Sequence, residues 1–518
     1  MHWSLLLETV FFHPGKDRLN TKSLVSFAKA PSLKVVLVPE VKKTINDYQQ
    51  QVQKIVDLGE TVYGINTGFG YLAHVSIPRQ DLQKLQVNLI RSHASGVGEP
   101  LERSVARALL LLKAHNLCLG FSGASLECIE SMLNLVHHDL IPIIPIKGSV
   151  GASGDLAPLA HLSLVLLGEG EVYYQGGIVK TKEAFAHRKL SPYQPKAKEG
   201  LALINGTQFM ATLGAFAVET AKSLIYSADV IASMSLDAVR GSLKPFDKRI
   251  HLVREQEGQR QCAENILNIF QGHDQILKSH IDCKRVQDAY SFRCIPQVHG
   301  ASRDALHYVD TIINRELNSC TDNPLIFLDG TSLSGGNFHG QPLALALDFL
   351  GIALAEIGSI SERRIEKLTN PNFSELPAFL AQNSGLNSGF MIPHVTAAAL
   401  VSENKVLAHP ASVDSIPTSA DKEDHVSMGP IAARKALQIA DNVAYVLAIE
   451  LLTACQGIDI LAPLVPSPTL KIVYDFVRTQ SPKVDEDRAL YHDIAWFSTW
   501  IKEGGLISLL ETNGITLI

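Results

Sequence analysis

A long apolar run, PLALALDFLGIALAEIGSI, extends from Pro342 to Ile360 and limits the architectures open to this chain. Its length approaches that of a membrane-spanning helix, which needs about 20 apolar residues. Asp348 and Glu356 interrupt the run, and a carboxylate at either place would be costly in lipid. We therefore expect a helix buried in a soluble bundle. The helix is expected to continue to Lys367 through a more polar, solvent-exposed end.

A second helical pattern lies between Ile431 and Gln456, where apolar residues recur at steps of three and four. Long patterns of this kind dominate from about residue 205 onward. Shorter elements and glycine-rich loops dominate before it, including a hairpin around Gly176. The sequence predicts a mainly α-helical protein: a long helical bundle, 205–518, with a smaller, loop-rich N-terminal part, 1–204.

Composition indicates burial on a large scale. Hydrophobic residues make up 46% and charged residues only 19% of the 518 residues. A chain with so few charged residues to cover its surface is expected to bury part of that surface in a subunit interface. The net charge of −6 comes from 46 basic and 52 acidic residues, so no basic field favours nucleic acid. We expect neither a nucleic-acid partner nor a membrane partner.

The spacing of cysteines and histidines argues against a metal site, because no C-x-x-C pair and no zinc-ligand spacing occurs. The seven cysteines are Cys118, Cys128, Cys262, Cys283, Cys294, Cys320 and Cys455. Their scatter and odd number are typical of reduced thiols in a cytoplasmic protein. The N-terminal stretch MHWSLLLETVFFHPGKD has neither a basic start nor a clear cleavage site, so we expect no secretory signal.

The run GSVGASGDLAPLAHLSL, residues 148–164, contains the tripeptide Ala152-Ser153-Gly154. If the Gly154 nitrogen attacked the Ala152 carbonyl, a five-membered ring would close, which only a tight turn poor in side chains allows. Loss of water from the ring and from the Ser153 hydroxyl would leave an electron-poor alkene. The plainer alternative is a turn that opens a helix, with Ser153 or Asp155 as N-cap. A nucleophile elbow fits poorly, because Asp155 stands where G-x-S-x-G requires glycine.

Further stretches carry polar groups that such an electrophile would need. Residues 63–70, YGINTGFG, form a glycine loop headed by Tyr63; a phosphate cradle is the alternative, but the P-loop lysine and the dinucleotide spacing are missing. In residues 92–98, SHASGVG, His93 precedes another glycine turn, and a structural histidine is the alternative. Asn205 follows an apolar run and could equally satisfy turn backbone.

Two later stretches complete the set. In VQDAYSFRCIPQVHG, residues 286–300, Gln287, Tyr290 and Arg293 recur every three residues, which predicts one side of a helix that Pro296 ends. An arginine fork beside a phenol suits carboxylate capture near a base. In residues 412–428, SVDSIPTSADKEDHVSM, the triplet 423–425 is either functional or a solvated acidic turn.

Together these stretches resemble the aromatic amino acid ammonia-lyases that carry a methylidene-imidazolone cofactor, from about Thr61 to about Gln456. Within that family the chain is most similar to the histidine ammonia-lyases. The pair Ser92-His93 agrees with them, and phenylalanine and tyrosine enzymes usually have an amide where Glu423 stands. The stretches QDAYSFRCIPQVHGA and SGGNFHGQP, the second of which contains Phe338, also look like bacterial histidine ammonia-lyases.

The resemblance implies that Ala152-Ser153-Gly154 forms 4-methylidene-imidazole-5-one, with no metal or nucleotide. It implies that L-histidine is deaminated non-oxidatively to trans-urocanate and ammonia, the first step of histidine degradation. Tyr63 is implied as the base that removes the β-proton, with Tyr290 supporting the site and cofactor. The implied substrate-binding residues are His93 and Glu423 at the imidazole, Arg293 at the carboxylate, Asn205 at the amino-acid backbone, and Gln287, Phe338 and Met391.

Two departures from the family pattern bear on substrate preference. Asp421-Lys422 stands before Glu423 where relatives usually have Asn-Gln, and Pro393-His394 follows Met391 where Ala-Gln is more usual. Three alternatives remain: a tyrosine or phenylalanine ammonia-lyase with the same cofactor, an aminomutase with that cofactor, and a non-enzymatic protein, either a helical scaffold or a degenerate relative that binds an amino acid without turning it over.

The resemblance also implies a mainly α-helical homotetramer whose helices pack into a central bundle, with each active site assembled from several subunits. Because the implied site draws on residues 63 to 423, we expect the two regions to form one interwoven catalytic unit.

Overall fold

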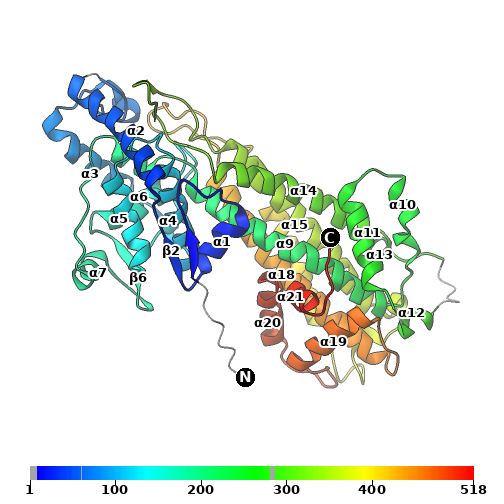
Figure 1. The fold of residues 1–518 in the computed structure, drawn as a ribbon. Helices are drawn as coiled ribbons and strands as arrows, with labels where there is room; N and C mark the ends of the chain where they lie inside the picture. The colour runs from blue at the N-terminus through cyan, green and yellow to red at the C-terminus, as the bar shows by residue number, and fades with distance from the viewer. Residues whose placement is uncertain (1–8, 60, 273, 281–285) are drawn as a thin grey trace. The chain divides into compact units, whose positions relative to one another are not determined.

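The computed structural model describes residues 9–59, 61–272, 274–280 and 286–518 (Figure 1). Helices α1 to α21 make up most of this part of the chain, and its strands, β1 to β9, are all short. The expectation of a mainly α-helical fold is confirmed. Cys283 and the first eight residues, which were interpreted above from the sequence, lie outside the described residues.

The chain divides into two compact units, each built from three stretches. Unit 1 comprises Met1–Phe216, Asp310–Leu347 and Ala411–Arg434, and unit 2 comprises Ala217–Val309, Asp348–Pro410 and Lys435–Ile518. Four long helices, α9 (Gln208–Ala238), α14 (Ile295–Glu316), α15 (Gln341–Thr369) and α18 (Gly429–Ile460), each begin in one unit and end in the other. The sequence-based division after residue 204 stays a prediction.

Unit 1 holds all the strands of the described residues, together with helices of up to 20 residues and parts of the long helices. Its helices are α1 (Thr21–Lys29), α2 (Pro39–Leu58), α3 (Leu82–His93), α4 (Arg103–Cys118), α5 (Leu126–His137), α6 (Leu156–Leu166), α7 (Thr181–Arg188), α8 (Glu199–Ile204), the start of α9 (Gln208–Ala238), and the 3-10 turns Gly70–His74 and Arg79–Asp81. Helix α4 is buried from Val105 to Cys118, although this stretch includes the charged residues Arg107 and Lys113.

The strands of unit 1 form four small sheets. Strands β1 (Val10–Phe12) and β2 (Leu33–Val35) pair in parallel; β3 (Val97–Pro100) and β5 (Pro145–Lys147) are antiparallel; β4 (Ile141–Pro142), β6 (Glu171–Tyr174) and β7 (Gly177–Lys180) lie in the order β4-β6-β7; β8 (Leu325–Ile326) and β9 (Ser332–Leu333) are antiparallel. The hairpin predicted at Gly176 is confirmed as the β6–β7 turn, where Tyr174 pairs with Gly177.

Unit 2 consists of helices and the loops between them, with no strand among its described residues. Besides parts of α9, α14 (Ile295–Glu316), α15 (Gln341–Thr369) and α18 (Gly429–Ile460), it contains α10 (Lys248–Leu252), α11 (Glu257–Ile269), α12 (Gln275–Lys278), α13 (Tyr290–Arg293), α16 (Pro371–Ser374), α17 (Met391–Leu407), α19 (Pro468–Gln480), α20 (Tyr491–Lys502), α21 (Gly505–Thr512), and the 3-10 turns Lys244–Phe246 and Ala378–Leu380. Ile365, Ala397, Val446 and Ile449 form one buried cluster among α15, α17 and α18.

Helices α15 and α18 confirm the two long helices predicted from the apolar patterns. Both are long and apolar enough to cross a membrane by length and composition alone. However, 67% of the most apolar stretch of α15 and 83% of that of α18 are buried inside the protein. Their apolar character is therefore explained by helix packing.

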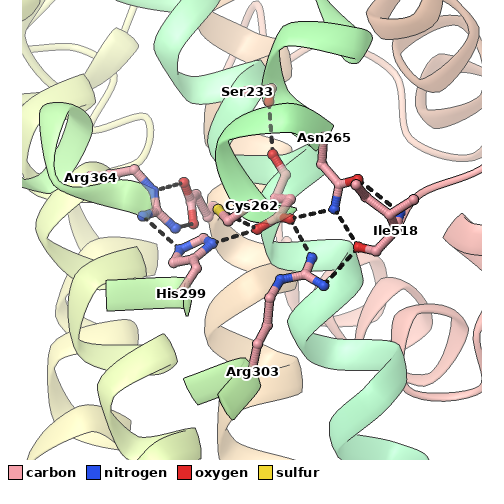
Figure 2. Close-up of polar contacts among 9 residues, drawn as sticks. Ser233, Cys262, Asn265, His299, Arg303, Arg364 and Ile518 are labelled. Atoms are coloured by element: carbon pink, nitrogen blue, oxygen red, sulfur yellow. Dashed lines mark hydrogen bonds and ion pairs between the residues drawn. The ribbon is translucent and has the colours of Figure 1, made fainter. Parts of the chain in front are cut away.

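A polar network is buried in the bundle of unit 2 (Figure 2). The Asp229 carboxylate on α9 accepts hydrogen bonds from His299 Nδ1 at 2.8 Å, from Cys262 Sγ at 3.2 Å and from Arg303. Burial alone would raise the pKa of the Asp229 carboxyl group. Arg303 and His299 outweigh this effect and hold the pKa of Asp229 well below its usual range. Asp229, Cys262 and His299 offer metal-ligand atoms within 4.8 Å of one another, yet the arginine already supplies the positive charge this carboxylate requires.

The network continues through His299, whose Nε2 accepts from the Arg364 guanidinium at 3.4 Å. Arg364 in turn forms a two-point ion pair with Glu450, at 2.5 and 2.9 Å. Ser235 and Ser361 donate the remaining hydrogen bonds to this carboxylate, at 2.7 and 2.5 Å. Because every charge has a partner, the buried network avoids the large cost of an isolated ion.

The helix predicted across Gln287, Tyr290 and Arg293 and ended by Pro296 is wrong. Gln287 lies in a bend, α13 is a single turn, and Pro296 lies in the first turn of α14. Proline is tolerated there because its missing N–H would have no partner inside the helix. Pro296 therefore begins a helix instead of ending one.

Candidate active site

The tripeptide 152–154 forms a tight turn between β5 and α6. Ser153 and Gly154 both have left-handed backbone conformations, with φ of +50° and +79°. Gly154 forms a parallel bridge with Gly206, in which Asp155 N donates to Gly206 O at 2.8 Å and Gly206 N donates to Ser153 O at 3.3 Å. A Cβ at Gly154 would lie 2.1 Å from Gly206 O. Only glycine fits at position 154, because the opposing atom belongs to backbone.

Asp155, which follows the tripeptide, occupies the N-cap position of α6 but makes no side-chain capping bond. Its carboxyl group instead accepts a hydrogen bond from Met210 N at 3.0 Å, in the first turn of α9. Complete burial raises the pKa of Asp155 to about 8. The alternative interpretation, a turn that opens a helix with Asp155 at its N-cap, agrees with the position of Asp155, but the side chain ties the tripeptide to α9 instead of capping α6.

A cavity of about 520 Å³ opens beside the tripeptide, and all the residues that line it belong to unit 1. Its polar lining residues are Tyr63, Asn88, Ser92, His93, Ser153, Ser419 and Glu423. Its apolar lining includes Phe69, Leu72, Val75, Leu85, Leu89, Leu156, Leu201 and Ile204. Such a cavity suits a small ring-bearing molecule that needs a few fixed polar contacts.

Glu423 lies directly beside the tripeptide. Its Oε1 accepts from Ser153 Oγ at 3.2 Å, and its Oε2 accepts from Thr418 Oγ1 at 2.8 Å. Residues 419–421, which lie between Thr418 and Glu423 in the sequence, all have left-handed φ, from +53° to +61°. Three consecutive non-glycine residues in this region cost about 1–3 kcal/mol each, so the turn that carries the unusual Asp421-Lys422 pair is strained.

Tyr63 and His93 lie on the same cavity. The Tyr63 hydroxyl accepts from Gly70 N at 3.5 Å, and burial raises the pKa of this phenol above its usual value. His93 ends α3, and its Nδ1 donates to Leu89 O at 2.8 Å. Burial lowers the pKa of His93, so the ring is neutral at neutral pH and its Nε2 is left as an acceptor.

Asn205 lies next to Gly206 and is almost fully buried, but it does not line the cavity. Its Nδ2 donates to Asp322 Oδ1 at 3.0 Å and to Asn323 O at 3.1 Å. Its Oδ1 accepts no hydrogen bond within the described residues. The Asn205 amide therefore faces Asp322 and Asn323, while the next residue, Gly206, contacts the tripeptide.

The remaining predicted residues are not among those that line the cavity. Gln287, Tyr290, Arg293 and Met391 belong to unit 2. Tyr290 is 70% exposed, and the Arg293 guanidinium lies over its ring at 4.3 Å. Phe338 belongs to unit 1 and is partly exposed in the loop before α15.

Sequence reasoning missed one buried charge near the tripeptide. Lys113 of α4 is completely buried, and its Nζ donates to the Asn205 carbonyl oxygen at 2.7 Å and to Gln208 Oε1 at 3.3 Å. The signal was available: Lys113 follows the run ALLLL, where a lone lysine inside an apolar helix is rare.

Comparison with known proteins extends these observations to the level of a family. Residues 19–479 match the family model described as aromatic amino acid lyase. The chain therefore belongs to the aromatic amino acid lyases, a family that includes carbon–nitrogen lyases. Membership supports a methylidene-imidazolone cofactor in general terms.

Individual relatives are similar over nearly their whole length. A histidine ammonia-lyase of Alkaliphilus oremlandii is 51% identical over 478 residues, 92% of this chain and 94% of that protein. The crystal structure of histidine ammonia-lyase from Trypanosoma cruzi is 43% identical, with a TM-score of 0.89 over 97% of this chain and 95% of that one. Tyrosine aminomutase from Streptomyces globisporus is 33% identical, with a TM-score of 0.92 over 98% and 100%. The fold alone thus does not separate lyase from aminomutase.

Proposed function

We propose that this chain eliminates ammonia from L-histidine to give trans-urocanate, using a ring formed from Ala152, Ser153 and Gly154. The observation that carries the proposal is the carboxylate of Glu423, held 3.2 Å from the Ser153 hydroxyl in an otherwise largely apolar cavity. An anionic acceptor there favours a substrate ring with N–H donors over a hydrocarbon ring. The 51% identity to a histidine ammonia-lyase supports the same substrate.

The residues present fit the proposed ring. The turn 152–154 is free of bulky side chains, and the backbone of Gly154 is pressed against Gly206 so closely that a Cβ is excluded. The Ser153 side chain, which would lose its hydroxyl, already points at the cavity that it lines. When present, the ring supplies an electrophile that turns the substrate amine into a better leaving group.

Two side chains would recognise the imidazole. His93 offers Nε2 as an acceptor, because its Nδ1–H is bound to Leu89 O. Glu423 offers a carboxylate that the Thr418 hydroxyl holds through Oε2, and its Oε1, which accepts from Ser153 Oγ, is freed for the substrate once Ser153 loses its hydroxyl. Both groups accept hydrogen bonds, so together they favour a ring with two N–H groups, the imidazolium form of histidine.

Tyr63 is the proposed base. Removal of a weakly acidic β-proton requires an ionised phenol within reach of the substrate, and a phenol ionises near pH 10 in water. Because burial raises the pKa of Tyr63 further, the working site requires added positive charge. We propose that Arg293, which would pair with the substrate carboxylate, contributes this charge, and that Tyr290, Gln287, Asn205, Phe338 and Met391 complete the site.

A homotetramer with shared active sites would supply these residues from neighbouring subunits. Helix α15 exposes large apolar side chains on one face, with Leu345, Phe349 and Ile352 being 51%, 44% and 40% exposed. A face of this kind favours a subunit interface. We further propose a cytoplasmic location, in keeping with cysteines that are all unpaired within the described residues.

The proposal is tested by following ultraviolet absorbance and released ammonia with L-histidine, L-tyrosine and L-phenylalanine in parallel. We expect conjugated urocanate and one ammonia per turnover from histidine only. Product from tyrosine or phenylalanine alone would overturn the assignment of His93 and Glu423 to an imidazole. A β-amino acid with little ammonia would identify an aminomutase, which the TM-score of 0.92 to one such enzyme keeps as the second candidate.

A further inference from the structure

Lys113 carries a buried charge that no part of the proposed reaction uses. It lies on α4, and its side chain is fully enclosed. Within the described residues, no carboxylate lies within ion-pair distance of its Nζ, which instead donates to two neutral oxygens, Asn205 O at 2.7 Å and Gln208 Oε1 at 3.3 Å. Burial lowers the pKa of Lys113 to about 8. Burying an ammonium without a carboxylate partner costs several kcal/mol. A functional role for Lys113 would explain why the protein keeps a charge at this position.

The peptide group that Lys113 contacts is the one that contacts the tripeptide. The Asn205 carbonyl oxygen accepts from Lys113, and the N–H on the other side of the same peptide bond, that of Gly206, donates to the Ser153 carbonyl oxygen at 3.3 Å. Carbonyl and N–H are coupled by resonance across the planar peptide bond. An ammonium on the carbonyl therefore makes the N–H a stronger donor.

The Ser153 carbonyl is where charge develops when Ser153 loses water. In that step the Cα–H bond breaks, its electron pair forms the Cα=Cβ bond, and the Cβ–Oγ bond breaks. The hydroxide that leaves combines with the released proton, so one water is the only by-product. As the proton departs, negative charge spreads onto the Ser153 carbonyl oxygen, and a hydrogen-bond donor aimed at such an oxygen stabilises the transition state.

We propose that Lys113 is a positioning residue for formation of the cofactor: through the Asn205–Gly206 peptide group it strengthens the hydrogen bond to the Ser153 carbonyl oxygen and so speeds the dehydration of Ser153. The inference rests on the proposed ring. It assigns to α4, which does not line the cavity, a part in building the electrophile.

Surrounding contacts fix the position of the Asn205–Gly206 peptide group, which connects Lys113 to the Ser153 carbonyl oxygen and is called the relay below. Asp155 N, one residue beyond the tripeptide, donates to Gly206 O at 2.8 Å, so both sides of Gly206 are fixed to the turn. Gln208, the second partner of Lys113, donates to Thr321 Oγ1 at 2.8 Å. The peptide group between Lys113 and Ser153 is therefore held from several directions.

Lys198 provides a matched control. It is equally buried, and its Nζ binds Asp322 Oδ2 at 2.6 Å. Asp322 in turn binds the side chain of Asn205, not its peptide group. Removing the Lys198 charge thus disturbs the same neighbourhood without touching the relay from Lys113 to Ser153.

The experiment measures the formation of the ring by intact mass. Full-length wild type, Lys113→Met, Lys113→Arg, Lys113→Gln and Lys198→Met are made by cell-free synthesis, quenched in denaturant at successive times and weighed, with far-UV circular dichroism reporting folding. Wild type should become lighter by two water molecules. Folded Lys113→Met should do so at least about tenfold more slowly, a part of the 10²–10³-fold effect of one such donor, while Lys113→Arg keeps most of the rate.

The other outcomes are equally decisive. Dehydration of Lys113→Met at the wild-type rate, or an equal delay in Lys198→Met, would overturn the inference. If Lys113→Met does not fold, the comparison of Lys113→Gln with Lys113→Arg decides: a slower glutamine variant supports the relay, and equal rates overturn it. A wild-type chain that never loses water would instead overturn the proposed ring itself.

Discussion

Gly206 offers a sharp test of how tightly the tripeptide turn is built. We consider Gly206→Ala. The φ of +116° at this position lies outside the regions open to L-residues, which costs about 1–3 kcal/mol. The new Cβ would also lie 2.6 Å from Gln208 Oε1 and 2.7 Å from Thr321 Oγ1, and overpacking of this kind costs about 1–3 kcal/mol more. The expected loss is therefore about 2–6 kcal/mol.

Gly176→Ala is the matched control, because Gly176 has a φ of +82° in the β6–β7 turn but no atom within 4 Å of the added Cβ. Only the backbone term applies there, about 1–2 kcal/mol. Urea unfolding followed by circular dichroism should show a clearly larger fall in the unfolding free energy for Gly206→Ala, with an unchanged m-value. Equal losses for the two variants would refute the claim that side-chain crowding at Gly206 fixes this turn.

Further predictions follow from the site and the core. Tyr63→Phe should lower kcat with histidine by about 10²–10⁴-fold while intact mass still shows the loss of two waters; an unchanged kcat would remove Tyr63 as the base. The raised pKa of Asp155, about 8 against an ordinary 3.8, favours folding when the group is protonated, so stability should fall as pH rises from about 4 to about 8. Asp155→Asn should lack this component, and thermal melts with parallel pH profiles for both proteins would contradict it. Glu450→Gln should destabilise the protein by about 3–5 kcal/mol, and adding Arg364→Met should cost little more in denaturant unfolding, whereas additive losses would show that the two residues act independently.

The long helices could be read from the sequence because each carries its own periodic signal. The run at Pro342 and the pattern from Ile431 both became helices close to the predicted bounds. The segment around Tyr290 failed for a local reason: a three-residue step fits several backbone paths, and proline is compatible with the start of a helix as well as with its end. The sequence around Pro296 does not say which applies.

Part of the candidate site could also be predicted from the sequence. Ser153, Glu423, Tyr63 and His93 are far apart in sequence but line one cavity. What the sequence could not show was the hydrogen-bonded surroundings, such as the bridge between Gly154 and Gly206. In the sequence, a close contact between two backbone segments is indicated only by a glycine. Because this chain has 36 glycines, the sequence does not show which of them make such contacts. Arg293 belongs to unit 2 and does not line this cavity, so its part in the site stays a prediction.

The bridge between Gly154 and Gly206 also links the proposed loss of water to folding, so the mass of each molecule would record whether it has folded. The turn acquires its full set of contacts only after α8 and α9 have docked beside it, so the proposed loss of water would mark a chain that has once been native. Later unfolding would not restore the lost atoms. A mass spectrum of aggregated or denatured material would then separate molecules that folded and subsequently failed from those that never folded.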